Sequence, residues 1–151
     1  RMRRGSLSSL PIHNCRKTSL LAQTSMSVLT PPTIAEGPTT NLFLVDAKGQ
    51  LLTPTAAKVL HGVTRSSILE LAKSEGIPCR ETQLPPEALL GAAEAFLTGT
   101  SAGVWPIESV DGNELGEVCP GPISTRLRDR FRRAASGEDP EFAHWLTPVT
   151  A

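Results

Sequence analysis

The sequence has no excess of charge of either sign, because 15 Lys and Arg residues are balanced by 15 Asp and Glu residues. A net charge of zero provides no broad basic field, so nucleic acid is not an expected partner. No apolar run is long enough to cross a bilayer, although 39% of the residues are hydrophobic. The composition is that of a globular chain of one domain, with no membrane partner.

Cysteine is scarce and dispersed. The three cysteines, Cys15, Cys79 and Cys119, form no CxxC pair and no Cys/His cluster. This spacing predicts neither a metal site nor a disulfide framework. A reducing compartment is the simpler expectation, which makes the cytoplasm the predicted location.

The first 35 residues differ from the remainder in amino-acid composition and charge. They hold five basic residues and no acidic one, are rich in Ser, and show no sustained periodicity. This composition resembles that of a transit peptide, which would imply a plastid or mitochondrial location. A mistranslated or truncated end is the favoured alternative, because Arg1 precedes Met2. We expect residues 1–34 to be a disordered or mistranslated segment and the chain to be a fragment.

Apolar periodicity from Ile34 onward predicts a folded α/β domain. Strands are expected at 42–45, from 51 and at 104–110, with turns at 48–49 and 111–113. Helices are expected at 64–75, 86–95 and 123–135, the first of them stopped by Gly76.

Two short segments predict an anion site. In 60–65 a glycine precedes the start of the helix at Thr64, where free backbone N–H groups favour a phosphate. The alternative is that Thr64 is an ordinary N-cap. The small-residue turn 98–103 offers further donors as an anion nest.

Taken in order, several motifs make the chain similar to one enzyme family. They are EGPTTNLF (36–43), LTP (52–54), LHGVTR (60–65), Glu81, AEAF (93–96), TGTSA (98–102), GPI (121–123) and HWLTPV (144–149). Residues 35–151 resemble the C-terminal, cofactor-binding domain of the class IV aminotransferases, which are pyridoxal-phosphate enzymes of fold type IV. The bacterial branched-chain amino acid aminotransferases are the most similar members.

The resemblance implies a role for eight residues. Glu36 matches the acid that pairs with the pyridine nitrogen of pyridoxal 5'-phosphate, and Leu60 matches the residue on the ring face. The phosphate positions are Gly62, Val63, Thr64 and Thr100, and the positions that receive the substrate carboxylate are Ser101 and Ala102.

The catalytic lysine of the family has no counterpart here. The resemblance implies a Schiff-base lysine about three dozen residues before the acid, whereas Lys17 stands only 19 residues before Glu36. Lys48, Lys58 and Lys73 follow Glu36, and we assign the role to none of the four. The small N-terminal domain and the family's tyrosine are also absent from this sequence. We therefore expect no catalytic residue in the chain and no activity from it alone.

The function implied by the resemblance is pyridoxal-phosphate-dependent transamination of branched-chain amino acids with 2-oxoglutarate. The alternatives are a D-amino acid aminotransferase or an aminodeoxychorismate lyase of the same fold, or a non-catalytic remnant. The expected partners are small amino acids and 2-oxo acids, and the intact enzyme is expected to be a homo-oligomer.

Overall fold

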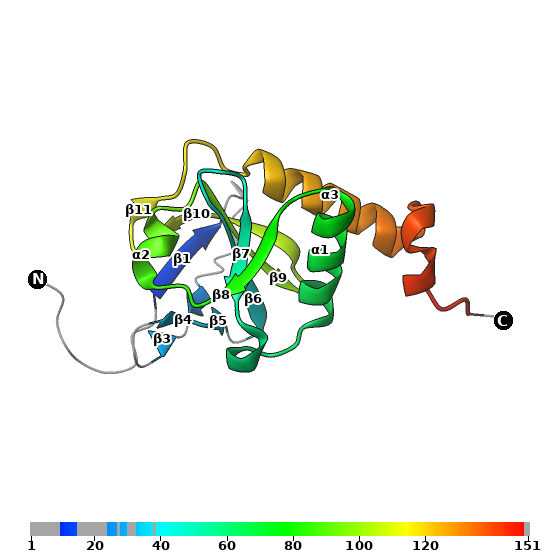
Figure 1. The fold of residues 1–151 in the computed structure, drawn as a ribbon, viewed down its shortest axis with the longest axis horizontal. Helices are drawn as coiled ribbons and strands as arrows, with labels where there is room; N and C mark the ends of the chain where they lie inside the picture. Colours follow the sequence, from blue (N-terminus) through cyan, green and yellow to red (C-terminus); the bar gives the residue numbers. More distant parts are fainter. Residues whose placement is uncertain (1–9, 15–23, 27, 30–32, 38, 150–151) are drawn as a thin grey trace, which may run out of the picture.

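The fold is a twisted sheet with helices against it (Figure 1). The structure is a computed structural model that describes residues 10–14, 24–26, 28–29, 33–37 and 39–149. The strands are β1 (Leu10–Asn14), β2 (Thr24–Met26), β3 (Val28–Leu29), β4 (Thr33–Ile34), β5 (Glu36–Gly37), β6 (Thr40–Val45), β7 (Leu51–Pro54), β8 (Cys79–Thr82), β9 (Glu94–Gly99), β10 (Gly103–Val110) and β11 (Asn113–Glu114). The helices are η1 (Ala56–Lys58), α1 (Val63–Ser74), α2 (Pro86–Leu90), α3 (Pro122–Ser136) and η2 (Pro140–Trp145).

The order of strands across the main sheet is β2-β1-β10-β9-β6-β7-β8, with β5 paired to β6 and β11 paired to β10. Every described pair in this sheet is antiparallel except β7 with β8, whose connection passes through α1. Neighbouring strands β6 and β9 align Phe43 with Phe96. The two rings stack at a centroid distance of 5.2 Å, which fixes the register at the centre of the sheet.

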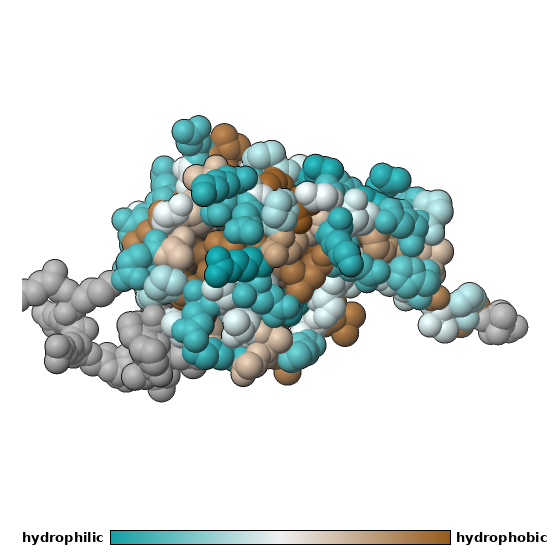
Figure 2. All heavy atoms as spheres, in the orientation of Figure 1, coloured by the Kyte–Doolittle hydropathy of each residue, from teal (hydrophilic) through white to brown (hydrophobic). Residues whose placement is uncertain are grey.

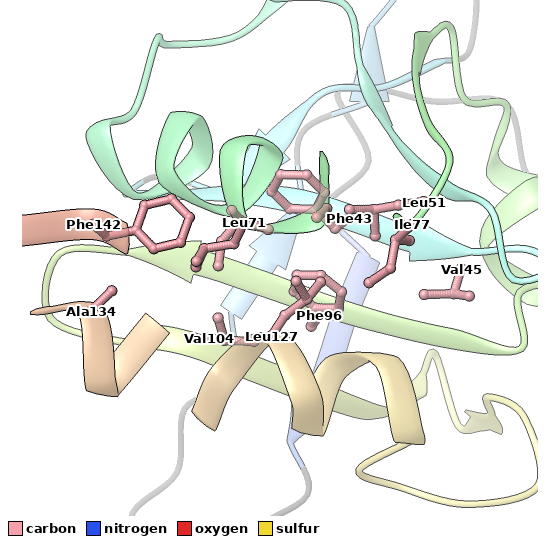
Figure 3. Close-up of a cluster of buried hydrophobic side chains, with 12 residues drawn as sticks. Phe43, Val45, Leu51, Leu71, Ile77, Phe96, Val104, Leu127, Ala134 and Phe142 are labelled. Carbon is pink, nitrogen blue, oxygen red and sulfur yellow. The ribbon is translucent and has the colours of Figure 1, made fainter. Parts of the chain in front are cut away.

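One face of the sheet packs against α1 and α3. Because side chains alternate along a strand, Phe43 and Phe96 share this face. Leu71 of α1 and Leu127 of α3 point into the same cluster, and both are fully buried (Figure 3). Phe142 of η2 extends this cluster toward the C-terminus.

The opposite face forms a second apolar cluster beneath α2. Leu42 and Leu44 of β6 and Leu97 of β9 meet Leu89 of α2 there. The sheet is therefore buried on both sides in its middle, which explains why β6 reads as an uninterrupted apolar run.

Most of the predicted elements are confirmed, including the strands at β6, β7 and β10 and the helices at α1 and α3. Gly49 (φ +77°) sits in the turn between β6 and β7, and Gly76 (φ +68°) follows α1, as predicted. The helix predicted over 86–95 is wrong beyond Leu90, because Ala95 pairs with Leu44 in strand β9. Tertiary pairing overrides the helical preference of this alanine-rich stretch.

The two principal helices begin differently. The buried Glu94 carboxylate accepts hydrogen bonds from the backbone N–H groups of Ile123 (2.9 Å) and Ser124 (2.8 Å), so it caps α3. The N-cap of α1 is Gly62, which provides no side-chain hydrogen bond. Within the described residues, α3 therefore starts with backbone donors bonded to a side chain, whereas α1 does not.

An ion cluster joins the end of α1 to α3 and η2. Arg130 of α3 pairs with Glu75, Asp139 and Glu141, and Arg126 also pairs with Glu75. Hydrogen bonding to Arg130 lowers the pKa of Glu75 below its ordinary value. The basic residues of α3 thus serve partly to hold the C-terminal segment.

The N-terminal segment contains strands that sequence periodicity did not predict. Strand β1 pairs with β10, aligning Ile12 with Val110, and β2 pairs with β1. The rest of residues 1–34 lies largely outside the described residues, so the expectation of disorder or mistranslation stays a prediction.

Two further findings concern the cysteines and the helices of the described part of the chain. Cys119 is disulfide-bonded, contrary to the absence of disulfides expected from the wide cysteine spacing. No helix within the described ranges is long and apolar enough to span a membrane.

Candidate functional site

Three polar side chains lie in a row across neighbouring strands at one end of the sheet. Glu36 of β5 is paired with Asn41 of β6, and Asn41 is paired with Thr98 of β9. Asn41 and Thr98 occupy the next positions along the face that carries Phe43 and Phe96, because residues two apart on a strand share a face. The row therefore lies where the apolar core beneath α1 ends.

The first turn of α1 borders the same end of the sheet. Its first intrahelical hydrogen bond runs from Ser66 to the Gly62 carbonyl (3.1 Å). The N–H groups of Val63, Thr64 and Arg65 precede that bond and have no helical acceptor. The alternative in which Thr64 caps the helix is wrong, since Gly62 is the N-cap and Thr64 lies inside the first turn.

A cavity of about 110 Å³ joins the strand row to the helix start. Its walls come from the β5–β6 hairpin, the segment before α1, the first turn of α1 and the end of β9. The lining residues are Glu36, Gly37, Thr39, Thr40, Asn41, Leu60, Gly62, Val63, Thr64, Thr98, Gly99 and Thr100. Below we call this space the α1 cavity.

The Glu36 carboxylate is held by two donors. Asn41 Nδ2 donates to Glu36 Oε2 at 2.8 Å, and the Leu60 backbone N–H donates to Oε2 and Oε1 at 3.0 and 3.1 Å. A carboxylate has about four acceptor positions, so these contacts leave capacity for a further donor. Glu36 is therefore oriented and still able to accept a proton-bearing group.

Two hydroxyl groups in the cavity wall have no hydrogen-bond partner in the part of the chain that the structure describes. The Oγ1 atoms of Thr40 and Thr98 are buried and make no hydrogen bond to another described residue, and only 1% of Thr98 is exposed. A buried hydroxyl without a partner is costly. Polar atoms of this kind are what a ligand with acceptor oxygens would satisfy.

Close backbone approach shapes the wall between these hydroxyls. A Cβ added at Gly99 would lie 2.9 Å from the Thr39 carbonyl oxygen, so a side chain there would collide with the β5–β6 hairpin. A Cβ at Gly62 would overlap Asn41 Oδ1. Glycine at 62 and at 99 therefore allows these segments to pack closely against Asn41 and Thr39.

A larger cavity of about 500 Å³ lies on the other side of the turn after β9. It shares Thr39, Thr40, Gly99 and Thr100 with the α1 cavity, and it adds Ser101 and Ala102 from the turn. The further lining residues are Val104, Trp105, Pro106, Pro120 and Arg128. The two cavities thus meet along one small-residue turn.

The structure brings together six of the eight residues predicted for the site. Glu36, Leu60, Gly62, Val63, Thr64 and Thr100 all line the α1 cavity, and Ser101 and Ala102 line the neighbouring one. Leu60 and Val63 are 74% and 81% exposed, so apolar side chains stand at the open rim of the α1 cavity. Thr64 is 6% exposed and lies deeper.

An ion pair between the buried Arg65 and the exposed Glu81 connects the first turn of α1 to the sheet. Arg65 Nη2 donates to the Glu81 carboxylate of β8 at 2.8 Å and to the Pro54 carbonyl of β7 at 3.0 Å. Arg65 is 4% exposed, and its hydrogen bond lowers the pKa of Glu81. This pair ties the helix start to the sheet edge. Glu81 therefore has a structural contact here and does not line the α1 cavity.

A third hollow runs along the sheet edge between α1 and β8 and contains none of the predicted site residues. It is lined by Leu69, Lys73, Gly76, Ile77, Pro78, Cys79, Arg80 and Glu81. Figure 2 shows hydrophobic residues gathered near the centre of this face, within a mostly hydrophilic surface. No group of three or more potential metal ligands occurs among the described residues, and no lysine of the described part lines either of the two site cavities.

Sequence reasoning missed Asn41, Thr40 and Thr98. The contact between Glu36 and Asn41 could have been predicted from the local sequence, because a tight hairpin after Glu36 brings Asn41 opposite it. The position of Thr98 beside Asn41 could not have been predicted locally, because it depends on the pairing of β6 with β9, which are far apart in the sequence.

Comparison with known proteins assigns the chain to a family. Residues 22–110 match the model of the family described as amino-transferase class IV, and this match starts earlier than the resemblance noted from residue 35. The chain belongs to the class IV aminotransferases.

Relatives within that family include proteins named as branched-chain-amino-acid aminotransferases. The protein of Salmonella typhimurium is 41% identical over 119 residues, which is 78% of this chain, and that of Pseudomonas aeruginosa is 36% identical over 116 residues. The chain spans 38% of the length of these curated relatives.

Solved structures show the same fold, that of the fold type IV aminotransferases. The Thermobaculum terrenum branched-chain amino acid aminotransferase, in its PLP-containing holo form, matches with a TM-score of 0.81 at 35% identity, over 85% of this chain and 42% of its own. The branched-chain aminotransferase of Thermoproteus uzoniensis, in a structure with norvaline, matches with a TM-score of 0.79 at 33% identity, over 85% and 42%.

Proposed function

We propose that residues 35–151 form the cofactor-binding domain of a pyridoxal-phosphate-dependent aminotransferase that acts on branched-chain amino acids and 2-oxoglutarate. The observation that carries the proposal is the convergence of Glu36, the first turn of α1 and Thr100 on the α1 cavity. Membership of the class IV family and the names of the relatives support the reaction.

The donors and acceptors of the α1 cavity fit pyridoxal 5'-phosphate. One side offers an oriented carboxylate at Glu36, and the other offers uncapped helix N–H groups and unpartnered threonine hydroxyls. A group with a basic ring nitrogen at one end and a phosphate at the other matches this separation of charge.

The ring end of the site is assigned to Glu36 and Leu60. The carboxylate of Glu36 would hold a proton on the ring nitrogen of a bound cofactor, because an anion beside that nitrogen favours its protonated form. Leu60 lies at the rim with an exposed apolar side chain that can cover a ring face. When bound, pyridoxal phosphate acts as an electron sink for the negative charge that develops at the substrate α-carbon.

The phosphate end is assigned to Gly62, Val63, Thr64 and Thr100. The N–H groups of the first turn point toward the place where an anion gains from the helix dipole. The Thr64 and Thr100 hydroxyls would donate further hydrogen bonds to a bound phosphate, and charge-assisted bonds of this kind are stronger than neutral ones.

The substrate carboxylate is assigned to the turn of Ser101 and Ala102. Their backbone N–H groups are available as donors in a small-residue turn that borders both cavities. This position lies next to Thr100, so one turn serves the phosphate on one side and the substrate on the other. We propose a homo-oligomer for the intact enzyme, with an organellar location if the basic N-terminal segment is a transit peptide.

The cofactor part of the proposal is tested with pyridoxamine 5'-phosphate, which lacks the aldehyde and so forms no imine with surface lysines. Isothermal titration of the 151-residue chain with this probe is compared with a titration with pyridoxamine. We expect saturable binding of the phosphorylated probe and at least tenfold weaker binding of pyridoxamine. Absence of binding, or equal binding of both compounds, contradicts the proposal.

The substrate part is tested with 4-methylvaleric acid, a branched-chain acid that resembles the leucine skeleton. We expect the amide signals of Ser101 and Ala102 to shift on its addition to the chain saturated with pyridoxamine 5'-phosphate. The alcohol 4-methylpentanol has the same branched chain without the carboxylate and is expected to leave both signals unchanged. Equal shifts with the two compounds would argue against carboxylate recognition by this turn.

A further inference from the structure

Asn41 links three segments that meet at the α1 cavity. Its Nδ2 donates one hydrogen bond to Glu36 Oε2 (2.8 Å) and one to the Leu60 carbonyl oxygen (3.0 Å). The Leu60 N–H in turn donates to the Glu36 carboxylate (3.0 and 3.1 Å). Glu36, Leu60 and Asn41 thus form a closed ring of hydrogen bonds between β5, β6 and the segment before α1.

We propose that Asn41 is a positioning residue, which orients the Glu36 carboxylate and the Leu60 backbone toward the ring of the cofactor. The inference rests on the proposed function, since it assigns a further residue to the same site. Asn41 acts through Glu36 and Leu60. No hydrogen bond from its own side chain to the cofactor is required.

The chemistry of an amide is needed at this position. Both hydrogens of Asn41 Nδ2 are used, one on a carboxylate and one on a carbonyl, and both partners are acceptors only. The reversed amide would place Oδ1 against two acceptors, so the partners determine the orientation. A carboxylate of the same shape would face the Glu36 carboxylate with like charge and would offer no donor at neutral pH.

Burial and shape make this arrangement rigid. Asn41 is 6% exposed, and its Oδ1 occupies the space that a Cβ at Gly62 would need. Gly62 is the N-cap of α1, so the amide of Asn41 also determines how closely the helix start approaches β6. A shift of Asn41 would therefore move the acid at the ring end and the segment that carries Leu60.

The decisive test compares Asn41→Asp with the wild-type chain in two titrations. The probes are pyridoxamine 5'-phosphate, which has a pyridine ring and a phosphate group, and inorganic phosphate, which has no ring. We expect Asn41→Asp to lower affinity for pyridoxamine 5'-phosphate about tenfold or more, and to leave affinity for inorganic phosphate within about twofold. A purely structural role would weaken both ligands alike, and that result would overturn the inference.

Two further comparisons complete the experiment. Asn113→Asp introduces the same change at an exposed residue of β11 that lines neither cavity, and it is expected to leave both affinities unaltered. In the Glu36→Gln background, Asn41→Asp is expected to cause much less than its full loss, because the residue it orients is already altered. Hydrogen exchange of the Leu60 amide is expected to accelerate in Asn41→Asp and to stay unchanged in Asn113→Asp.

The outcomes separate this inference from the proposed function. If the wild-type chain fails to bind pyridoxamine 5'-phosphate, the proposed function is contradicted, and the positioning role of Asn41 is contradicted as well. If the wild-type chain binds the probe and Asn41→Asp binds it equally well, the positioning role alone is wrong.

Discussion

The unpartnered hydroxyl of Thr98 leads to a prediction with opposite signs for stability and for ligand affinity. Thr98 is 1% exposed, and its Oγ1 has no hydrogen-bond partner among the described residues. Removing a buried hydroxyl from water without a new partner costs about 1–3 kcal/mol. Valine has nearly the same shape and favours strands. We therefore expect Thr98→Val to raise the free energy of unfolding of the ligand-free chain by about 1–2 kcal/mol.

Ligand affinity is expected to change in the other direction. If the Thr98 hydroxyl is satisfied by the phosphate of the cofactor, its removal loses a charge-assisted hydrogen bond of about 1.5–3 kcal/mol. That loss corresponds to about tenfold weaker binding of pyridoxamine 5'-phosphate or more. The assay pairs urea unfolding of the ligand-free chain with isothermal titration of the same preparation.

Thr53→Val provides a matched control. Thr53 is equally buried at 1% exposure, but its hydroxyl donates to the Leu42 carbonyl oxygen at 2.7 Å. Loss of this satisfied hydrogen bond is expected to destabilise the chain by about 1 kcal/mol, and affinity should stay unchanged. If Thr98→Val destabilises the ligand-free chain as Thr53→Val does, the reasoning from the unpartnered hydroxyl is refuted.

Three other predictions follow from the site and the ion cluster. Thr64→Val is expected to weaken binding of pyridoxamine 5'-phosphate about tenfold, and an unchanged titration would remove Thr64 from the phosphate site. Because Arg130 lowers the pKa of Glu75, the stability from this pair is complete above the ordinary glutamate pKa of about 4.3 and is lost as the pH falls through the lowered value. Glu75→Gln should therefore reduce the acid dependence of the urea midpoint, and an unaltered slope would contradict this. The 151-residue chain alone is expected to form no glutamate from leucine and 2-oxoglutarate. If it forms glutamate in a cofactor-dependent reaction that Lys17→Ala abolishes, then Lys17 was wrongly rejected as the catalytic lysine.

Local sequence determined the elements whose signals are local. The apolar run at 42–45 predicts β6, the spacing of Ile68, Leu71 and Ala72 predicts α1, and Gly76 predicts where α1 ends. These patterns succeed because each records which face of one strand or helix is buried. The family motifs likewise singled out six residues that line the α1 cavity, and the binding roles of these residues stay predictions.

Strands with little apolar patterning in their own sequence were not predicted. Strand β8 is short and mostly exposed, so its residues Cys79–Thr82 show no apolar alternation. The start of β9 reads as a continuation of α2, because Ala92, Ala93 and Ala95 are good helix formers. Pairing with β6 makes this segment a strand, and the neighbouring residues in the sequence do not indicate that pairing.

The internal arrangement of the site was decided by the tertiary structure. Sequence alone placed an acid at Glu36 and a helix start near Thr64, but it did not bring Thr98 beside Asn41 or show that Gly62 caps α1. Those contacts depend on the register between β6 and β9 and on the docking of α1 over their ends. The register is set by side chains such as Phe43 and Phe96, which meet only after distant segments have paired, so the cavity is a product of non-local packing.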